Sequence, residues 1–203
     1  VYFSNAIASQ VGAARIGEGI LPGISILVLI MFLSMGVSFS ATSITREGDK
    51  FFHTKLIPVR YRKQLAVKLC LYMVVAIPSI LVSCFTLFFF NFLSITETIL
   101  YSVAISFIIL GNVSFGIERD IKNPKFRYVG NNEYTGTNRN VISLIGVGMF
   151  ISMVMGIGAI LLSFFLSLDF IYYVLFGFAV PYALIETIML FKNAERNYHR
   201  IET

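Results

Sequence analysis

Long stretches without any charged residue alternate along the chain with short segments that are rich in charge. The uncharged stretches contain 27, 28, 20, 29 and 16 residues and cover Gly19–Thr45, Leu69–Thr96, Thr98–Ile117, Asn140–Leu168 and Phe170–Ile185. A helix of about 20 apolar residues crosses the hydrocarbon core of a bilayer, and lipid offers no hydrogen-bond partners to an unpaired backbone. The fifth stretch reaches this length when it is continued past Glu186 to Phe191. The pattern therefore predicts five transmembrane helices, because barrel strands would read as ten-residue alternating segments.

The predicted fold is all-α, a polytopic transmembrane helical bundle that forms a single domain over residues 1–203. The spans are expected at about 21–44, 65–93, 96–117, 140–168 and 170–191, with polar loops at 45–64 and 118–139. Two connections are very short, so the second and third spans form one helical hairpin and the fourth and fifth another. Because the chain begins with Val1 and has an odd number of spans, we expect a fragment of a longer chain.

Composition supports a membrane protein and excludes several other classes. Of the 203 residues, 57% are hydrophobic and 13% are charged. Soluble domains carry roughly 25% charged residues, so this chain has too little polar surface for an ordinary soluble enzyme or a disordered protein. Cys70 and Cys84 lie in one apolar stretch, roughly 21 Å apart along a helix, which excludes a disulfide between them.

The distribution of basic residues predicts which side of the membrane each loop faces. Residues 46–63 contain six Lys or Arg, residues 118–139 contain five, and the tail after residue 191 contains three. The connections between these segments hold Glu97 and Asp169 and no basic residue. The positive-inside rule places both loops and the C-terminus in the cytoplasm and the N-terminus outside. The net charge of +5 is therefore a signal of topology in a cell membrane, and we expect no nucleic-acid partner.

Small residues and prolines recur inside the predicted spans. Pro78 and Pro181 lie in the middle of the second and fifth spans, where each removes a backbone hydrogen bond. Two interpretations stay open, a kink that shapes the bundle and a hinge that serves gating. Gly148, Ser152 and Gly156 are spaced four residues apart, which favours close helix packing in lipid. Residues of the same kind recur in the first span at Ser34, Ser38 and Thr42.

Few side chains within the spans carry chemistry. Glu186 is the one acidic residue inside them, about six residues from the cytoplasmic end of the fifth span. Ionisable residues in a membrane are functional candidates, and a packing or interfacial role is the alternative. Lys68 is expected to snorkel, and Asn112, taken to lie near a span end, to form interhelical hydrogen bonds. The sequence contains no phosphate-binding glycine loop and no paired histidines for a metal site.

The first cytoplasmic loop contains a short amphipathic segment. Residues 49–57 form a predicted helix in which Phe52 and Leu56 are four residues apart and Phe51 flanks them. Pro58 ends this helix, because the residue before proline avoids the α conformation. A basic helix with aromatic residues beside a membrane is typical of a surface anchor or of a helix that docks into a partner's groove. The periodicity leaves both interpretations open.

Two cytoplasmic stretches together resemble a known family. The first contains Ser43-Ile44-Thr45-Arg46-Glu47-Gly48, Phe51-Phe52, Lys55-Leu56-Ile57-Pro58-Val59, Lys63-Gln64-Leu65 and Lys68. The second contains Asp120-Ile121-Lys122-Asn123-Pro124-Lys125-Phe126, then Tyr128, Glu133, Asn138 and Asn140. From about residue 25 to its end, the chain is similar to the C-terminal half of the permeases of bacterial ATP-binding-cassette (ABC) exporters, type-2 class. It departs from their pattern at Asp49, which is inserted, at Tyr128, which replaces a tryptophan, and at Gly136, which replaces a lysine.

The resemblance implies a permease that is not itself an enzyme and binds no cofactor. ATP and magnesium would be bound by a separate cytoplasmic ABC ATPase subunit, and a second permease copy or half is a further implied partner besides the lipid bilayer. In this family a coupling helix between two spans docks on the ATPase. The residues that would form or flank this contact are Arg46, Glu47, Gly48, Phe51, Phe52, Lys55 and Pro58. We expect Phe51 and Phe52 to dock on the ATPase and Gly48 to permit a tight entry turn.

The substrate cannot be read from the sequence, and other classes of membrane protein remain alternatives. Pro78, Pro181 and Glu186 are the candidates for a hinge or a transport path. A secondary transporter or channel-like protein would need ion-coordinating groups near the midplane or broken helices in paired halves. A membrane-embedded enzyme would need a nucleophile, acids or histidines around a cavity, and the spans lack this set of residues.

Overall fold

The structure is a computed structural model that describes residue 24 and residues 28–56, 59–89, 94–125, 138–163 and 168–201. Its elements are η1 (Val37–Thr42), η2 (Thr45–Lys50), α3 (Phe51–Leu56), α4 (Tyr61–Phe89), α5 (Ile95–Lys122), α7 (Arg139–Ser163) and α8 (Leu168–Arg200). The described residues form helices and turns and contain no strand. The predicted all-α fold is confirmed.

In the described part of the chain, five helical segments are long and apolar enough to cross a membrane. They are Val28–Gly48, Tyr61–Phe89, Ile95–Lys122, Arg139–Leu162 and Tyr172–Arg200. These segments overlap the five predicted spans and identify a multi-pass membrane protein. Their described ends differ from the prediction, and at Tyr61, Lys122 and Arg200 polar residues continue the helix beyond the apolar core. The largest difference is in α8, which continues to Arg200 instead of ending near residue 191.

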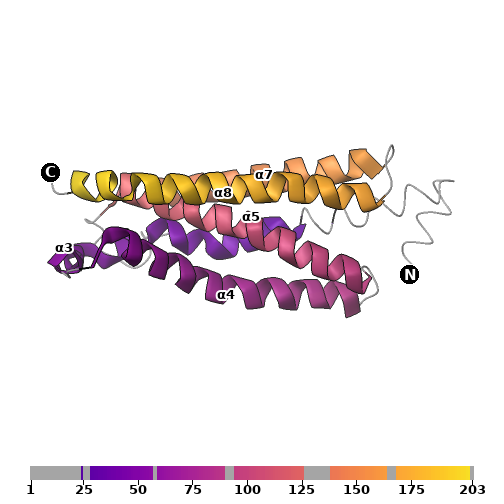
Figure 1. Cartoon of the computed structure of the whole chain (residues 1–203), viewed down its shortest axis with the longest axis horizontal. Coiled ribbons are helices and arrows are strands. Elements are labelled where there is room, and N and C mark those ends of the chain that lie inside the picture. The colour runs from indigo at the N-terminus through magenta and orange to yellow at the C-terminus, as the bar shows by residue number, and fades with distance from the viewer. Residues whose placement is uncertain are drawn as a thin grey trace.

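The helices run roughly side by side along the long axis of the molecule, and two hairpins connect them in chain order (Figure 1). The end of α4 and the start of α5 lie at one end of the molecule, and α3 and the end of α8 lie at the other (Figure 1). The end of α5 also lies near α3 and the end of α8. The segments that the basic residues assign to one side of the membrane are therefore at one end of the bundle.

The start of α5 is fixed by local chemistry. Ser94 precedes the helix, and its hydroxyl accepts a hydrogen bond from the Glu97 amide at 3.4 Å. The Glu97 carboxylate in turn accepts one from the Ser94 amide at 2.6 Å. This reciprocal capping box pairs backbone donors that the first turn of a helix leaves without partners. This cap explains why α5 begins at Ile95, although the apolar pattern continues on both sides of Ser94.

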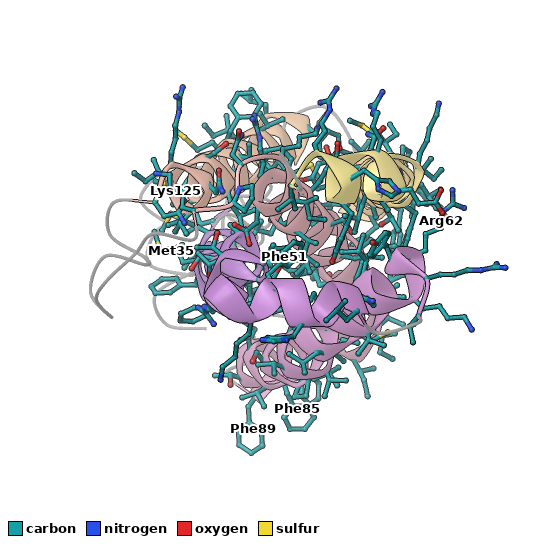
Figure 2. The ribbon with its side chains drawn as sticks, turned by 90° about the vertical axis from the view of Figure 1, so that its left-hand side faces the viewer. Met35, Phe51, Arg62, Phe85, Phe89 and Lys125 are labelled. Carbon is teal, nitrogen blue, oxygen red and sulfur yellow. The ribbon has the colours of Figure 1, made fainter. Side chains whose placement is uncertain are left out.

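Helix α5 is the centre of the bundle. It packs against α4, α7, α8 and η1, and it is the most buried of the five spans. Its buried face is rich in isoleucine, with Ile105, Ile108 and Ile109 almost fully enclosed. Helix α4 is the least buried span, and its Phe85 and Phe89 project away from the other helices (Figure 2). In a bilayer this face of α4 is available to lipid or to another protein.

Glycines on α5 and α7 allow neighbouring backbones to approach closely. A Cβ atom at Gly148 would overlap the Ser34 side chain, and one at Gly111 would overlap the Tyr182 ring. The close packing predicted for Gly148 is confirmed, since the small side chain of the first span fills the space above it. By contrast, Gly146 has open space where a Cβ would be.

Neither proline within a span faces the interior. Helices α4 and α8 continue through Pro78 and Pro181, and both proline side chains are exposed on the surface of the bundle. A residue that lines a path through the bundle would have to face inward. The surface position of both rings is more consistent with a role in shaping the helices than with contact to a transported molecule.

Candidate functional site: a segment held by four helices

The candidate site is the segment of residues 43–56, which links the first span to α4 and contains η2 and α3. Gly48 makes a kink within η2, three residues before α3 begins, with φ 51° and ψ −132°. Residues with a side chain rarely adopt positive φ, whereas glycine does so at little cost. The tight entry turn predicted at Gly48 is therefore present. A Cβ atom there would meet no other atom, so only backbone strain opposes substitution.

Asp120, near the end of α5, binds the start of segment 43–56. Its carboxylate is completely buried and accepts hydrogen bonds from the Ile44 amide at 2.5 Å and the Thr45 amide at 2.9 Å. The Thr45 hydroxyl donates to the other carboxylate oxygen at 2.5 Å. The Asn140 side chain, at the start of α7, adds a longer contact at 3.4 Å. We call these four residues the Asp120 cluster.

The same cluster connects the end of α5 to the start of α7. The Asn140 side-chain amide donates to the Asn123 carbonyl at 3.0 Å, and the Lys125 amide donates to the Thr45 hydroxyl at 3.2 Å. The Asn138 side chain accepts from the Asn140 amide at 3.0 Å and so caps the first turn of α7. The two stretches singled out in the sequence, which are about 75 residues apart, therefore meet in one buried network.

A second contact joins the segment to α4. Glu47 forms an ion pair with Lys68, and both side chains are mostly shielded from solvent. The Lys68 ammonium also donates to the Ser43 carbonyl at 3.4 Å. The sequence did not suggest this partner for Lys68. An acid 21 residues earlier in the chain is brought beside it, and pairing with this acid replaces hydration of the ammonium group.

Phe51 joins the segment to the end of α8. Its side chain is completely buried, and its ring lies 5.7 Å from the ring of Tyr198. Tyr198 stacks on Tyr61 at 4.6 Å, and Figure 2 shows Phe51 in the interior of this end of the molecule. The structure therefore does not present Phe51 on an outward docking surface, because the extended α8 covers it.

Other residues of the segment face outward or lie outside the description. Leu56, the last residue of α3, is 80% exposed, the largest exposure among the described large hydrophobic residues. Arg46 is exposed, and its guanidinium lies 4.6 Å from the ring centre of Phe39. The side chains of Phe52 and Lys55, and all of Pro58, lie outside the described residues.

Polar residues also meet inside the bundle. Asn112 is completely buried near the middle of α5, not near a span end, and its amide donates to the Ser34 hydroxyl at 2.9 Å. The Tyr182 hydroxyl of α8 donates to the Asn112 carbonyl oxygen at 2.8 Å. The interhelical hydrogen bonding predicted for Asn112 is confirmed. One turn further along α8, the Oε2 atom of Glu186 is buried and has no hydrogen-bond partner among the described residues.

The site is thus a junction at which one segment meets several helices. Segment 43–56 contacts α4 through Glu47, α5 through Thr45 and α8 through Phe51. Asp120 of α5 links it further to Asn140 of α7. Asp120 and Tyr198 are the residues of this junction that the sequence did not reveal as contacts. Comparison of the chain with family models, curated proteins and solved structures gave no match.

Proposed function

We propose that the chain is the membrane-spanning permease part of a bacterial ABC exporter of the type-2 class. It would move a substrate across the plasma membrane with energy from ATP that a separate cytoplasmic ATPase subunit hydrolyses. ATP and magnesium would bind to that subunit. In this proposal segment 43–56 and the C-terminus face the cytoplasm, in keeping with the basic loops.

The observation that carries the proposal is the meeting of the two stretches that resemble the family. Thr45 belongs to the first stretch and Asp120 to the second, and their side chains share a hydrogen bond inside the protein. A coupling element must be rigidly attached to the helices that it moves. The Asp120 cluster supplies such an attachment, because a carboxylate that accepts several short hydrogen bonds holds its donors in one geometry.

The contacts of the segment suggest how movement would be transmitted. An ATPase that pulls on α3 would displace Phe51 and Glu47, which are buried against Tyr198 of α8 and Lys68 of α4. Close-packed contacts of this kind do not stretch, so the connected helices would shift as bodies. The outward-facing Leu56 is the apolar side chain best placed to enter a groove of the partner.

Site-specific crosslinking tests this contact. The exposed Cys70 is first replaced by serine, and single cysteines are then introduced at Leu56 and, as the matched control, at the buried Phe51. The chain is co-expressed with the ABC ATPase encoded beside it, and a short thiol-to-amine reagent is added. We expect a crosslinked product from Leu56→Cys and at least about tenfold less from Phe51→Cys, since a buried thiol is inaccessible to the reagent.

The outcome is interpreted in a complex that hydrolyses ATP. Absence of any crosslink from Leu56→Cys in an active complex would contradict the docking role of α3. A stronger crosslink from Phe51→Cys than from Leu56→Cys would contradict the orientation of the segment.

A secondary transporter or channel-like protein is the competing proposal, and Glu186 is the observation that favours it. Its buried, unpartnered carboxylate oxygen lies one turn from Tyr182, in the bundle interior, where coupled ions or protons bind in such proteins. The variant Glu186→Gln separates the two proposals. A permease driven by the ATPase should keep its basal ATP hydrolysis, whereas loss of transport driven by an ion gradient in the absence of ATP would favour the competitor.

A further inference from the structure

A polar cavity of about 460 Å³ lies between the end of α5 and the end of α8. It is lined by Ile121, Lys122, Asn123, Pro124, Arg196, Asn197, Arg200 and Ile201. Cavities of about 300–1,000 Å³ are the usual size for binding a small ligand or a headgroup. Three of the described lining residues are basic and none is acidic, so the cavity is suited to an anion.

Two of the basic side chains around the cavity have described polar neighbours. Glu118, which is 3% exposed, forms an ion pair with Lys122 at 2.8 Å. The same carboxylate accepts a hydrogen bond from Asn193 at 3.1 Å, and Asn193 in turn accepts one from Arg196 at 2.9 Å. Asn193 is neutral, so it orients the Arg196 guanidinium without neutralising it.

The cavity is also at the right depth for a lipid headgroup. Lys192 is the first charged residue after the apolar part of α8, and Arg196 lies one turn further, roughly 6 Å along the axis. The polar layer of a bilayer extends about 5–8 Å beyond the hydrocarbon core on each side. Arg196 is thus expected at the level of the lipid phosphates, with Arg200 just beyond it.

We propose that this cavity binds the phosphate group of an anionic phospholipid, with Arg196, Arg200 and Lys122 as its cationic ligands. Guanidinium groups match the oxygens of a phosphate in a bidentate geometry, and basic pockets between transmembrane helices on the cytoplasmic side are typical lipid headgroup sites. The helix dipoles stabilise basic residues in the last turns of α5 and α8. This stabilisation offsets the repulsion between the basic side chains of the cavity. A free phosphate ion has the same chemistry, and the test below separates the two sources.

The test measures lipid retention by native mass spectrometry of the purified chain in detergent containing equal amounts of phosphatidylglycerol and phosphatidylcholine. We expect the wild-type protein to retain phosphatidylglycerol preferentially. The double variant Arg196→Gln/Arg200→Gln should reduce this preference by at least about tenfold, since neutral glutamine cannot replace the charge-assisted hydrogen bonds of a guanidinium to a phosphate. The matched control Arg60→Gln/Lys63→Gln removes the same charge from exposed positions outside the cavity and should change the preference less than about twofold.

Several results would overturn the proposal. Equal retention of the two lipids by the wild-type protein excludes a headgroup site, and this measurement requires no variant to fold. An equal loss in the control variant means that diffuse basic charge, not the cavity, selects the lipid. Displacement of bound phosphatidylglycerol by about 10 mM inorganic phosphate would assign the cavity to free phosphate.

Discussion

Replacement of Asp120 by alanine is expected to loosen the attachment of segment 43–56 and to lower the free energy of unfolding. The Asp120 carboxylate is completely buried and accepts two backbone amides, of Ile44 and Thr45, at 2.5 and 2.9 Å. It also accepts the Thr45 hydroxyl at 2.5 Å. Alanine would leave these donors without their acceptor in a space that the protein has closed to solvent.

The size of the effect follows from the number of donors that lose their acceptor. A buried polar group without a partner costs about 1–3 kcal/mol, so the two amides together account for about 2–6 kcal/mol. Part of this loss is offset, because the protein no longer has to bury a carboxylate. We therefore expect Asp120→Ala to destabilise the protein by about 3 kcal/mol. Asp120→Asn keeps one acceptor oxygen for the amides and should cost about 1–2 kcal/mol.

The measurement is an SDS titration of the purified protein in mixed detergent micelles, followed by helical circular dichroism. The matched control is Glu195→Ala, which removes an acid from an exposed ion pair with Arg62 at 3.6 Å. Exposed pairs contribute about 0–1 kcal/mol, so this control should be close to wild type. A double-mutant cycle of Asp120→Ala with Thr45→Val should give a coupling free energy of about 1–2 kcal/mol.

A loss below about 0.5 kcal/mol for Asp120→Ala, equal to that of the Glu195 control, would refute this reasoning. It would mean that water or neighbouring groups pair with the amides of Ile44 and Thr45. Additive effects in the double-mutant cycle would likewise show that Thr45 and Asp120 do not stabilise one another.

Two further predictions concern helix packing and membrane topology. Gly111→Ala should destabilise the protein by about 1–3 kcal/mol, because the new methyl group overlaps the Tyr182 ring, whereas Gly146→Ala has open space and should be neutral or stabilising by up to about 1 kcal/mol in the same SDS titration. In a protein whose two native cysteines are replaced by serine, an impermeant thiol reagent added to intact cells should label Glu97→Cys and leave Glu133→Cys unlabelled, since the positive-inside rule predicts that the basic loops face the cytoplasm. The reverse labelling pattern would contradict the proposed orientation.

Predictions from the sequence succeeded where a residue's own type and spacing decide its structure. The positive φ of Gly48 and the close helix contact at Gly148 follow from the absence of a side chain. The hydrogen bonding of Asn112 follows from the cost of an unpaired amide among apolar residues, which makes an interhelical partner necessary. In each case the sequence left the identity of the neighbour open.

The structure gives Lys68 and Phe51 neighbours that the pattern of their own segments did not suggest. The Lys68 ammonium was expected to extend toward the membrane surface. In the structure it pairs with Glu47, on the segment before α4. Phe51 was placed on an amphipathic docking ridge, but α8 continues beyond its apolar part and covers the ring with Tyr198. A polar tail after a span gives no indication in the sequence that it remains helical and packs back on another loop.

The sequence by itself determined the five apolar helices, because lipid cannot satisfy an unpaired backbone and about 20 uncharged residues match the thickness of its apolar core. The tertiary structure alone decided which helices segment 43–56 is attached to. That attachment depends on Asp120 meeting Thr45 and on Tyr198 covering Phe51, contacts between residues far apart in the chain. Such contacts are set by the mutual packing of α5, α7 and α8, and no local pattern specifies them.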